Sequence, residues 1–188
     1  MSAFQQKFYS FLPGVPTSDQ VDLVERMERF LFQNAARAGF IIRGYAGTGK
    51  TTAIAAMIKT FPSFQLKSVL LAPTGRAAKV LSNFSKKPAF TIHKKIYQSE
   101  RGKDGQTHFK LGANLHTNTI FIIDEASMIS DGGAHEQSLL DDLIEYVYTG
   151  KNCRLVFIGD IAQLPPVGKL LSPALDPKYL MSNYYLKL

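Results

Sequence analysis

This sequence of 188 residues lacks tryptophan and long apolar segments, and it has a single cysteine, Cys153. One cysteine excludes an internal disulfide and is typical of reducing compartments, so we expect a cytoplasmic protein. The longest apolar runs contain about five residues, far fewer than the roughly twenty of a membrane-spanning helix. The first residues lack a basic stretch followed by a long apolar one, which excludes a signal peptide.

Acidic side chains are scarce in the middle of the chain. The whole sequence has 22 basic and 15 acidic residues and a net charge of +7. Residues 59–110 contain eleven basic and two acidic residues, a net charge of +9, which leaves −2 for the remainder. A solvated basic face is one interpretation of this segment, and a track for a nucleic acid is the other.

What is present predicts a single α/β domain over residues 1–188. Apolar residues make up 45% of the chain, which is too many for a disordered polymer, and the length suits one full core. Four apolar runs predict buried strands at Phe40–Arg43, Val69–Ala72, Ile120–Ile123 and Leu155–Ile158. Helical periodicity predicts helices at Asp19–Ala36, Lys50–Lys59, Gly75–Leu81 and Glu136–Tyr148. Strands that alternate with helices indicate a parallel sheet in a layered fold.

Glycine and polar residues follow every predicted strand. The four segments are, in chain order, GYAGTGKT, PTG, DE and GD. In a parallel sheet these strand ends open at one edge, where the ligands of open α/β sheets bind. We therefore expect residues that are far apart in the sequence to converge on one crevice.

Two segments depart from the alternation. Ile96–Leu111 is polar and has Gly102 and Gly105 between two short runs, which predicts a small inserted β-hairpin. The tail from Gln163 contains four prolines, which predicts irregular structure until about Asn183–Leu188.

Residues Gly44–Thr51 match the pattern G-x-x-x-x-G-K-[ST] between a predicted strand and a predicted helix, the context that this motif requires. Glycines let backbone N–H groups surround a triphosphate, and the helix that begins near Lys50 directs its positive dipole end toward the phosphates. Lys50 adds a charge for the β and γ oxygens, and the Thr51 hydroxyl can bind Mg²⁺.

Acidic and amide side chains supply the rest of the predicted site. Asp124, at the end of a buried strand, can hold Mg²⁺, and the adjacent Glu125 can take a proton from an attacking water. Without the glycine-rich motif, Glu125 would be an ordinary acidic residue that opens a loop. Asp160 and Gln163 follow the fourth strand, and an amide in this position can sense a γ-phosphate or orient the attacking water.

Gln20 has two interpretations. The segment Thr17-Ser18-Asp19-Gln20 precedes an apolar helical pattern and matches a capping box, in which Gln20 returns to the backbone of the cap residue. An amide here could instead read the edge of an adenine.

Five segments together resemble the motifs of superfamily 1 DNA helicases, most closely the RecD-like and Dda-like 5′→3′ branch. They are GYAGTGKTT, APTGRAAKVL, TIH, IIDEASMI and GDIAQLPPVG, in the order in which that family carries them. The resemblance implies the first RecA-like domain of such a motor, a three-layer P-loop NTPase fold with a mainly parallel sheet. The segment 96–111 then resembles the small hairpin that parts duplex strands.

The resemblance also implies roles for individual residues. Catalysis would use Lys50, Glu125 and Gln163, and Mg²⁺ would bind Thr51 and Asp124. ATP would bind Gln20, Gly44, Ala46, Gly47, Thr48, Gly49, Lys50, Thr51, Thr52 and Asp160. Single-stranded DNA would bind Pro73, Thr74, Arg76, His93, Lys94 and Lys95. The basic surplus falls on the same stretch, where lysine and arginine would contact phosphates without reading sequence.

One departure from the family is serious. Its motors carry a second RecA-like domain with arginines that complete the ATP site, and nothing after Gly168 resembles one. We therefore expect a monomeric fragment that binds Mg·ATP weakly and hydrolyses it slowly or not at all, since such an arginine is worth about 10³–10⁵ in rate. The alternatives are a P-loop kinase, a non-catalytic nucleic-acid module with a regulatory nucleotide site, and a motor that runs on RNA.

Overall fold

The computed structural model describes residues 1–45, 47–101, 106–132, 138–160, 162–163, 166 and 170–188. Its centre is a parallel sheet of five strands in the order β1-β7-β6-β2-β3. The strands are β1 (Gly39–Arg43), β2 (Lys67–Ala72), β3 (Ala89–Thr91), β6 (Thr119–Ile123) and β7 (Arg154–Gly159). All four predicted strands are confirmed within two residues at each end, and β3 is an additional edge strand that the sequence analysis missed.

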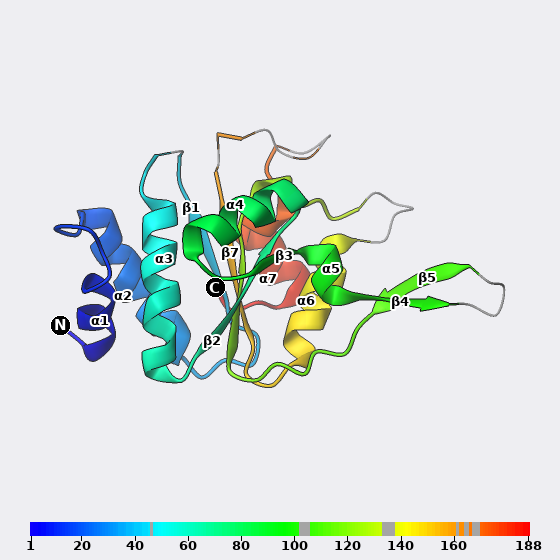
Figure 1. Cartoon of the computed structure of the whole chain (residues 1–188), viewed down its shortest axis with the longest axis horizontal. Coiled ribbons are helices and arrows are strands. Elements are labelled where there is room, and N and C mark those ends of the chain that lie inside the picture. Colours follow the sequence, from blue (N-terminus) through cyan, green and yellow to red (C-terminus); the bar gives the residue numbers. More distant parts are fainter. Residues whose placement is uncertain (46, 102–105, 133–137, 161, 164–165, 167–169) are drawn as a thin grey trace.

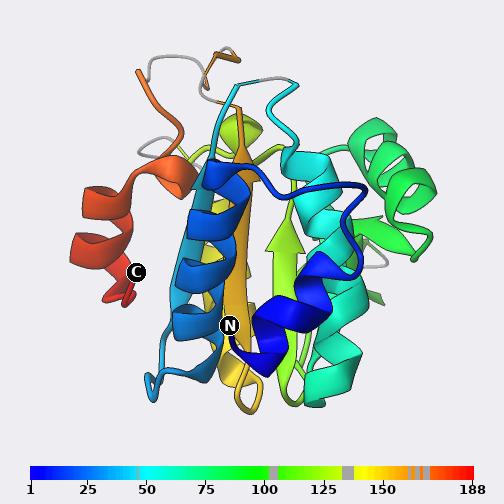
Figure 2. The ribbon, with the colours of Figure 1, turned by 90° about the vertical axis from the view of Figure 1, so that its left-hand side faces the viewer.

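Helices cover both faces of the sheet. One face carries α1, α2 and α3, which lie in front of the sheet in Figure 2, and the other carries α5, α6 and α7. The helices are α1 (Ala3–Tyr9), α2 (Ser18–Phe32), α3 (Lys50–Thr60), α4 (Gly75–Ser85), α5 (Ile92–Ile96), α6 (Leu139–Thr149) and α7 (Pro177–Tyr184). Short 3-10 helices are η1 (Phe61–Phe64), η2 (Ala126–Met128) and η3 (Pro173–Leu175). The predicted three-layer α/β fold is therefore confirmed.

Strand β6 shows why the predicted strands are almost continuously apolar. Ile120 and Ile122 pack in the cluster under α1, α2 and α3, whereas Phe121 and Ile123 pack in the cluster under α5, α6 and α7. Successive side chains of a strand point to opposite faces, so a strand covered on both sides must be apolar at every position.

A two-stranded antiparallel hairpin projects from the body of the molecule beyond α5 (Figure 1). It consists of β4 (Tyr97–Arg101) and β5 (Thr107–Leu111), which confirms the predicted insertion, although residues 102–105 lie outside the described part. The Tyr97 hydroxyl donates to Asp142 Oδ2 of α6 over 2.5 Å, and this bond fixes the base of the hairpin to the body. Burial and the neighbouring Asp142 raise the pKa of Tyr97, so the phenol stays protonated.

Several predicted boundaries need correction. Helix α2 ends at Phe32 rather than Ala36 because the chain becomes extended at Gln33. Helix α4 continues to Ser85, four residues beyond its predicted end. Helix α6 begins at Leu139 with Ser138 as its cap, and residues 136–137 of the predicted helix lie outside the described part.

The prediction of an irregular tail up to Asn183–Leu188 is wrong. Pro177 occupies the first turn of α7, where a missing N–H costs nothing, and the Asp176 side chain caps that turn by accepting from the N–H groups of Lys178 and Tyr179. Two further helices were not predicted, namely α1, which starts with a capping box between Ser2 and Gln5, and α5. Among the described helices, none combines the length and apolar character that crossing a membrane requires.

Arg154 of β7 binds the carbonyl groups at the C-terminal end of α2. The side chain is buried and donates from Nη1 to the Phe30 carbonyl (2.9 Å) and from Nη2 to the Gln33 carbonyl (2.8 Å). Burial lowers the pKa of the guanidinium, but the carbonyls at the negative end of a helix are favourable partners for a cation. This contact fixes the C-terminal end of the helix whose N-terminal end carries Gln20.

Replacing Arg154 by Met is expected to lower the free energy of unfolding by about 2–3 kcal/mol, because one buried and one partly buried carbonyl lose charge-assisted hydrogen bonds. Urea denaturation followed by circular dichroism measures the change. Arg29→Met, on the exposed side of α2, is the matched control and should stay within about 0.5 kcal/mol of the wild type. Equal effects of the two substitutions would contradict this account of the α2 terminus.

Candidate nucleotide site and nucleic-acid face

The structure brings the segments after β1, β6 and β7 together in one pocket at the edge where these strands end. The glycine-rich motif Gly44–Thr51 is called the P-loop below. Its residues Gly47, Gly49, Lys50 and Thr51, with the adjacent Thr52, form one wall, and the acidic and amide side chains form another. That second group consists of Asp124, Glu125, Asp160 and Gln163. The convergence expected from the parallel topology is therefore present for the residues predicted to handle phosphate and metal.

The P-loop leaves the start of α3 open. Gly47 (φ 78°) and Gly49 (φ 82°) adopt left-handed conformations, which only glycine enters without strain. No side chain caps α3, which begins at Lys50, so its first N–H groups have no side-chain acceptor and can serve an anion. Gly44 precedes these residues on the same loop, and Ala46 lies outside the described part.

Lys50 spans the loop in the structure. Its Nζ donates to the Gly44 carbonyl (2.6 Å) and to the Tyr45 carbonyl (2.5 Å), and the Thr48 hydroxyl also donates to Tyr45 (2.9 Å). Since these acceptors are neutral carbonyls, phosphate oxygens that enter the loop would be stronger partners for the ammonium group.

Asp124 and Glu125 are adjacent but differ in environment. The Asp124 N–H donates to the Leu71 carbonyl (2.9 Å), which continues the sheet pairing, and Asp124 Oδ1 accepts the Glu125 N–H (3.0 Å). Burial raises the pKa of the Asp124 carboxyl, and the nearby Lys50 partly opposes this. Glu125 has φ 55°, a left-handed conformation that is uncommon outside glycine and that clusters at functional sites.

Gln163 and Asp160 occupy the segment after β7. The Asp160 carboxylate accepts the Ala162 N–H (2.8 Å), and the Gln163 N–H donates to the Asp160 carbonyl (3.3 Å), so the segment turns back toward the pocket. The Gln163 side-chain oxygen accepts from the Ser127 hydroxyl (2.8 Å). Ser127 is not among the predicted site residues. In the sequence it is signalled by nothing more than a small polar residue two positions after Glu125.

Gln20 fills its structural role and still borders the loop. The Thr17 N–H donates to Gln20 Oε1 (3.1 Å) and the Gln20 N–H donates to the Thr17 hydroxyl (3.3 Å), which confirms the capping box. A Cβ added at Gly49 would lie 3.4 Å from Gln20 Nε2. Gln20 also lines a second hollow beside the P-loop, together with Arg43 and Tyr45. The reading of an adenine by Gln20 stays a prediction.

The residues predicted to contact DNA lie on α4, on α5 and just before α4. Pro73 is half-buried, and the Thr74 hydroxyl caps α4 by accepting the Ala77 N–H (3.2 Å). Arg76 on α4 is exposed. Thr74 and Arg76 line a further hollow together with Asp124, Glu125 and Gln163, so this face is continuous with the nucleotide pocket.

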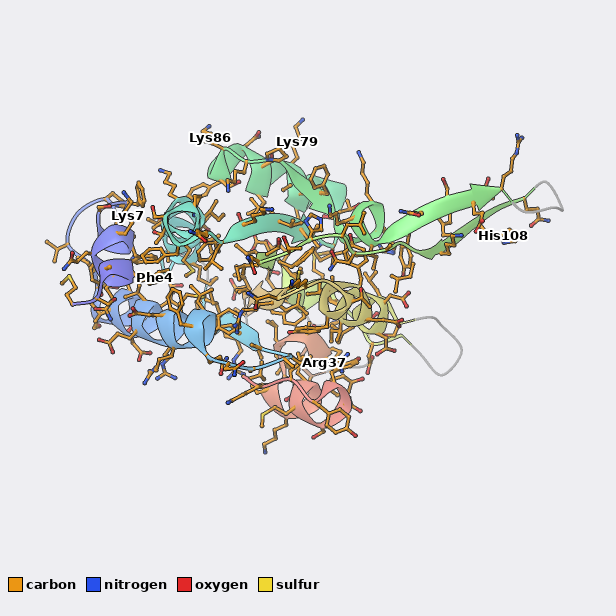
Figure 3. The ribbon with its side chains drawn as sticks, turned by 90° about the horizontal axis from the view of Figure 1, so that it is seen from below. Phe4, Lys7, Arg37, Lys79, Lys86 and His108 are labelled. Carbon is orange, nitrogen blue, oxygen red and sulfur yellow. The ribbon has the colours of Figure 1, made fainter. Side chains whose placement is uncertain are left out.

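Helix α5 presents His93 and Lys94 to solvent, and Lys95 is half-buried. The His93 ring packs against Tyr97 at the base of the hairpin, with 5.6 Å between ring centroids. Lys79 of α4 and Lys86, which follows the end of that helix, point outward from the body (Figure 3). The cationic side chains of α4 and α5, together with Lys86 after α4, form what we call the basic face. Lys110 on the hairpin is paired with Glu100, so not every cation of the basic segment is available to a ligand.

No group of three or more His, Cys, Asp or Glu side chains that could hold a metal exists among the described residues. A Mg²⁺ ion bound with a nucleotide needs fewer protein ligands, because phosphate oxygens and water complete its octahedral shell. The Thr51 hydroxyl and the Asp124 carboxylate line the same pocket, and oxygen donors of this kind suit Mg²⁺. The residues present therefore fit the predicted ion.

Residues 19–172 match the model of the AAA domain family. The ATP-dependent RecD2 DNA helicase of Deinococcus radiodurans is 32% identical over 154 residues, which cover 82% of this chain and 20% of that protein. An uncharacterised protein of Acanthamoeba polyphaga mimivirus is 32% identical over 170 residues, 78% of this chain and 33% of that protein.

A third relative, an uncharacterised protein of Methanocaldococcus jannaschii, is 34% identical over 162 residues, 78% of this chain and 12% of its own length. This chain thus spans between about an eighth and a third of these relatives. Among solved structures, the Pif1 helicase from Candida albicans shares the fold, with a TM-score of 0.50 and 20% identity over 87% of this chain and 37% of that chain. The chain belongs to the AAA domain family, and over most of its own length it is similar to the RecD2 DNA helicase.

Proposed function

We propose that this domain binds Mg·ATP in the pocket between the P-loop and the wall formed by Asp124, Glu125, Asp160 and Gln163. We propose further that it uses ATP hydrolysis to move along single-stranded DNA and to open a duplex. The observation that carries the proposal is one continuous surface. Asp124, Glu125 and Gln163 border both the P-loop pocket and the hollow that contains Thr74 and Arg76. A change at the terminal phosphate would therefore reach side chains that contact the nucleic acid.

The residues of the pocket have separate tasks in this proposal. The Lys50 ammonium group gives up its hydrogen bonds to two loop carbonyls and donates to phosphate oxygens instead. The first N–H groups of α3, which no side chain caps, supply further donors. Thr51 and Asp124 hold Mg²⁺, which neutralises phosphate charge when it is bound. Glu125 accepts the proton of the attacking water, and the amide of Gln163 donates to the terminal phosphate. These tasks are mainly positioning and electrostatic stabilisation, as phosphoryl transfer requires.

The same proposal includes five further properties. They are translocation, the 5′→3′ direction, the preference for DNA over RNA, the monomeric state and a cytoplasmic location. The support for movement is the similarity to the RecD2 helicase, of which this chain covers 20%. Stepping in this scheme comes from closure of two motor domains around the nucleotide. The domain described here would supply the P-loop half, so we propose weak binding and slow hydrolysis by this chain alone.

Lys50→Ala tests the nucleotide site. We expect the affinity for Mg·ATP to fall about 100-fold, because charge-assisted hydrogen bonds to phosphate are lost. Titration with a fluorescent ATP analogue measures the change. Lys59→Ala, near the other end of the same helix, removes the same charge outside the pocket and should bind like the wild type.

Two further results would contradict the proposal. Equal affinities of the Lys50 and Lys59 variants would show that ATP does not bind at the P-loop. Phosphate transfer from ATP to a small-molecule acceptor would favour the P-loop kinase, although the Asp160–Gln163 segment facing the pocket has no role in that reaction.

A further inference from the structure

A short turn links Glu125, the predicted base, to Gln163, the predicted phosphate sensor, through a hydrogen bond. Helix η2 (Ala126–Met128) follows Glu125 directly, and Ser127 in this turn is only 3% exposed. The Ser127 hydroxyl donates to Gln163 Oε1 over 2.8 Å across 36 residues of sequence. The bond joins the segment after β6 to the segment after β7 beside the pocket that both segments line.

The direction of this bond matters for Gln163. A glutamine amide carries one oxygen that accepts and one nitrogen that donates. Because the oxygen is held by Ser127, the nitrogen is left to donate to another acceptor. Gln163 itself is exposed, and a free glutamine side chain would lose up to about 2 kcal/mol of rotamer entropy on binding a ligand. A buried, fixed hydroxyl removes part of that cost in advance.

A second buried serine holds the same turn without touching Gln163. Ser172 is 1% exposed, and its hydroxyl lies 2.8 Å from the Ala126 carbonyl and 2.7 Å from the Ile129 carbonyl. Ser172 therefore holds both ends of the turn that carries Ser127, and it does so without any bond to the Gln163 amide. Ser172 stabilises the turn, whereas Ser127 contacts the Gln163 side chain, which lines the pocket.

We propose that Ser127 is a positioning residue that orients the Gln163 amide with its N–H donors toward the terminal phosphate of a bound nucleoside triphosphate. The hydroxyl thereby makes the site prefer a triphosphate over a diphosphate. This inference rests on the proposed function and adds a residue that acts through Gln163 rather than on the substrate.

The test compares the affinities of the 188-residue chain for a non-hydrolysable ATP analogue and for ADP, both with Mg²⁺. Ser127→Ala is expected to lower the triphosphate-to-diphosphate affinity ratio about fivefold to tenfold, as loss of one well-placed hydrogen bond does. Affinity for ADP should stay unchanged. Gln163→Ala should lower the ratio to a similar degree, and the double variant should lose no more than Gln163→Ala alone, because both substitutions remove the same interaction. Ser127→Thr retains the hydroxyl and should restore most of the ratio.

Ser172→Ala is the matched control, since it removes a buried hydroxyl from the same turn without contact to the amide. It should lower the melting temperature while the affinity ratio stays within twofold of the wild type. An unchanged ratio in Ser127→Ala, or additive losses in the double variant, would overturn the inference. If the wild-type chain binds neither nucleotide, the proposed function itself fails, and the two failures are therefore distinguishable.

Discussion

Replacing Glu125 by Gln is expected to slow ATP hydrolysis by about 10²–10⁴-fold, which is the usual contribution of a positioned general base, while Mg·ATP binding persists. The substitution keeps the shape of the side chain and removes its ability to take a proton. Glu125 occupies a left-handed backbone conformation (φ 55°) beside Asp124, and its N–H already donates to the Asp124 carboxylate. Since that bond uses the backbone, Glu125→Gln leaves it in place.

Single-turnover kinetics with the chain in excess over ATP, with single-stranded DNA present, measure this effect. The conditions suit a slow reaction, because an arginine donated by a second domain can be worth about 10³–10⁵ in rate. Glu145→Gln, at an exposed position of α6, is the control for loss of one negative charge. Hydrolysis at the wild-type rate in Glu125→Gln would rule out Glu125 as the base. Loss of ATP hydrolysis in both Glu125→Gln and Glu145→Gln would show that the effect is not local to the pocket.

Removing three cations from the basic face should weaken binding of single-stranded DNA and make it less sensitive to salt. Arg76 and Lys94 are exposed, Lys95 is half-buried, and none of the three has an ion-pair partner among the described residues. Each phosphate contact adds about 0.7 to the slope of log affinity against log salt for a single strand. The triple alanine variant should therefore have a slope that is shallower by about 2, and an affinity at 50 mM salt that is lower by roughly 10²–10³-fold.

Fluorescence anisotropy of a labelled oligothymidine, measured from 50 to 300 mM salt, gives both quantities. The matched control removes three exposed lysines that lie away from α4 and α5, namely Lys151, Lys178 and Lys187. It lowers the net charge by the same amount, so it separates a local track from general attraction by a basic protein. Equal slopes in the two triple variants would favour the simple solvated face.

Much of the scaffold was predictable because it depends on short-range patterns. A strand buried on both faces has to be apolar throughout, so the runs around Ile122 and Phe157 could be identified without coordinates. The parallel arrangement then predicted that strand ends share one edge, and the P-loop, Asp124 and Asp160 do line one pocket. The hairpin between Tyr97 and Leu111 was signalled by polar residues around glycine.

The errors have a common physical origin. Asp19–Ala36 reads as one helix, yet α2 ends at Phe32, where Arg154, more than 120 residues away in sequence, takes the last carbonyls. The proline-rich tail reads as irregular, but Pro177 is compatible with a first helical turn and α7 packs through Leu180 into the core. Local propensity is weak enough that such tertiary contacts override it.

The sequence by itself determined the class of fold and the positions of the glycine-rich motif and of the acidic pair at strand ends, because each depends on residue types at fixed spacings within one segment. Only the tertiary structure decided which atoms remain available for a ligand. It showed that Arg154 donates to the carbonyls at the end of α2, and that Ser127 holds the Gln163 oxygen. Hydrogen bonds of this kind are directional and saturable, so they depend on the placement of atoms that the chain brings together only when it folds.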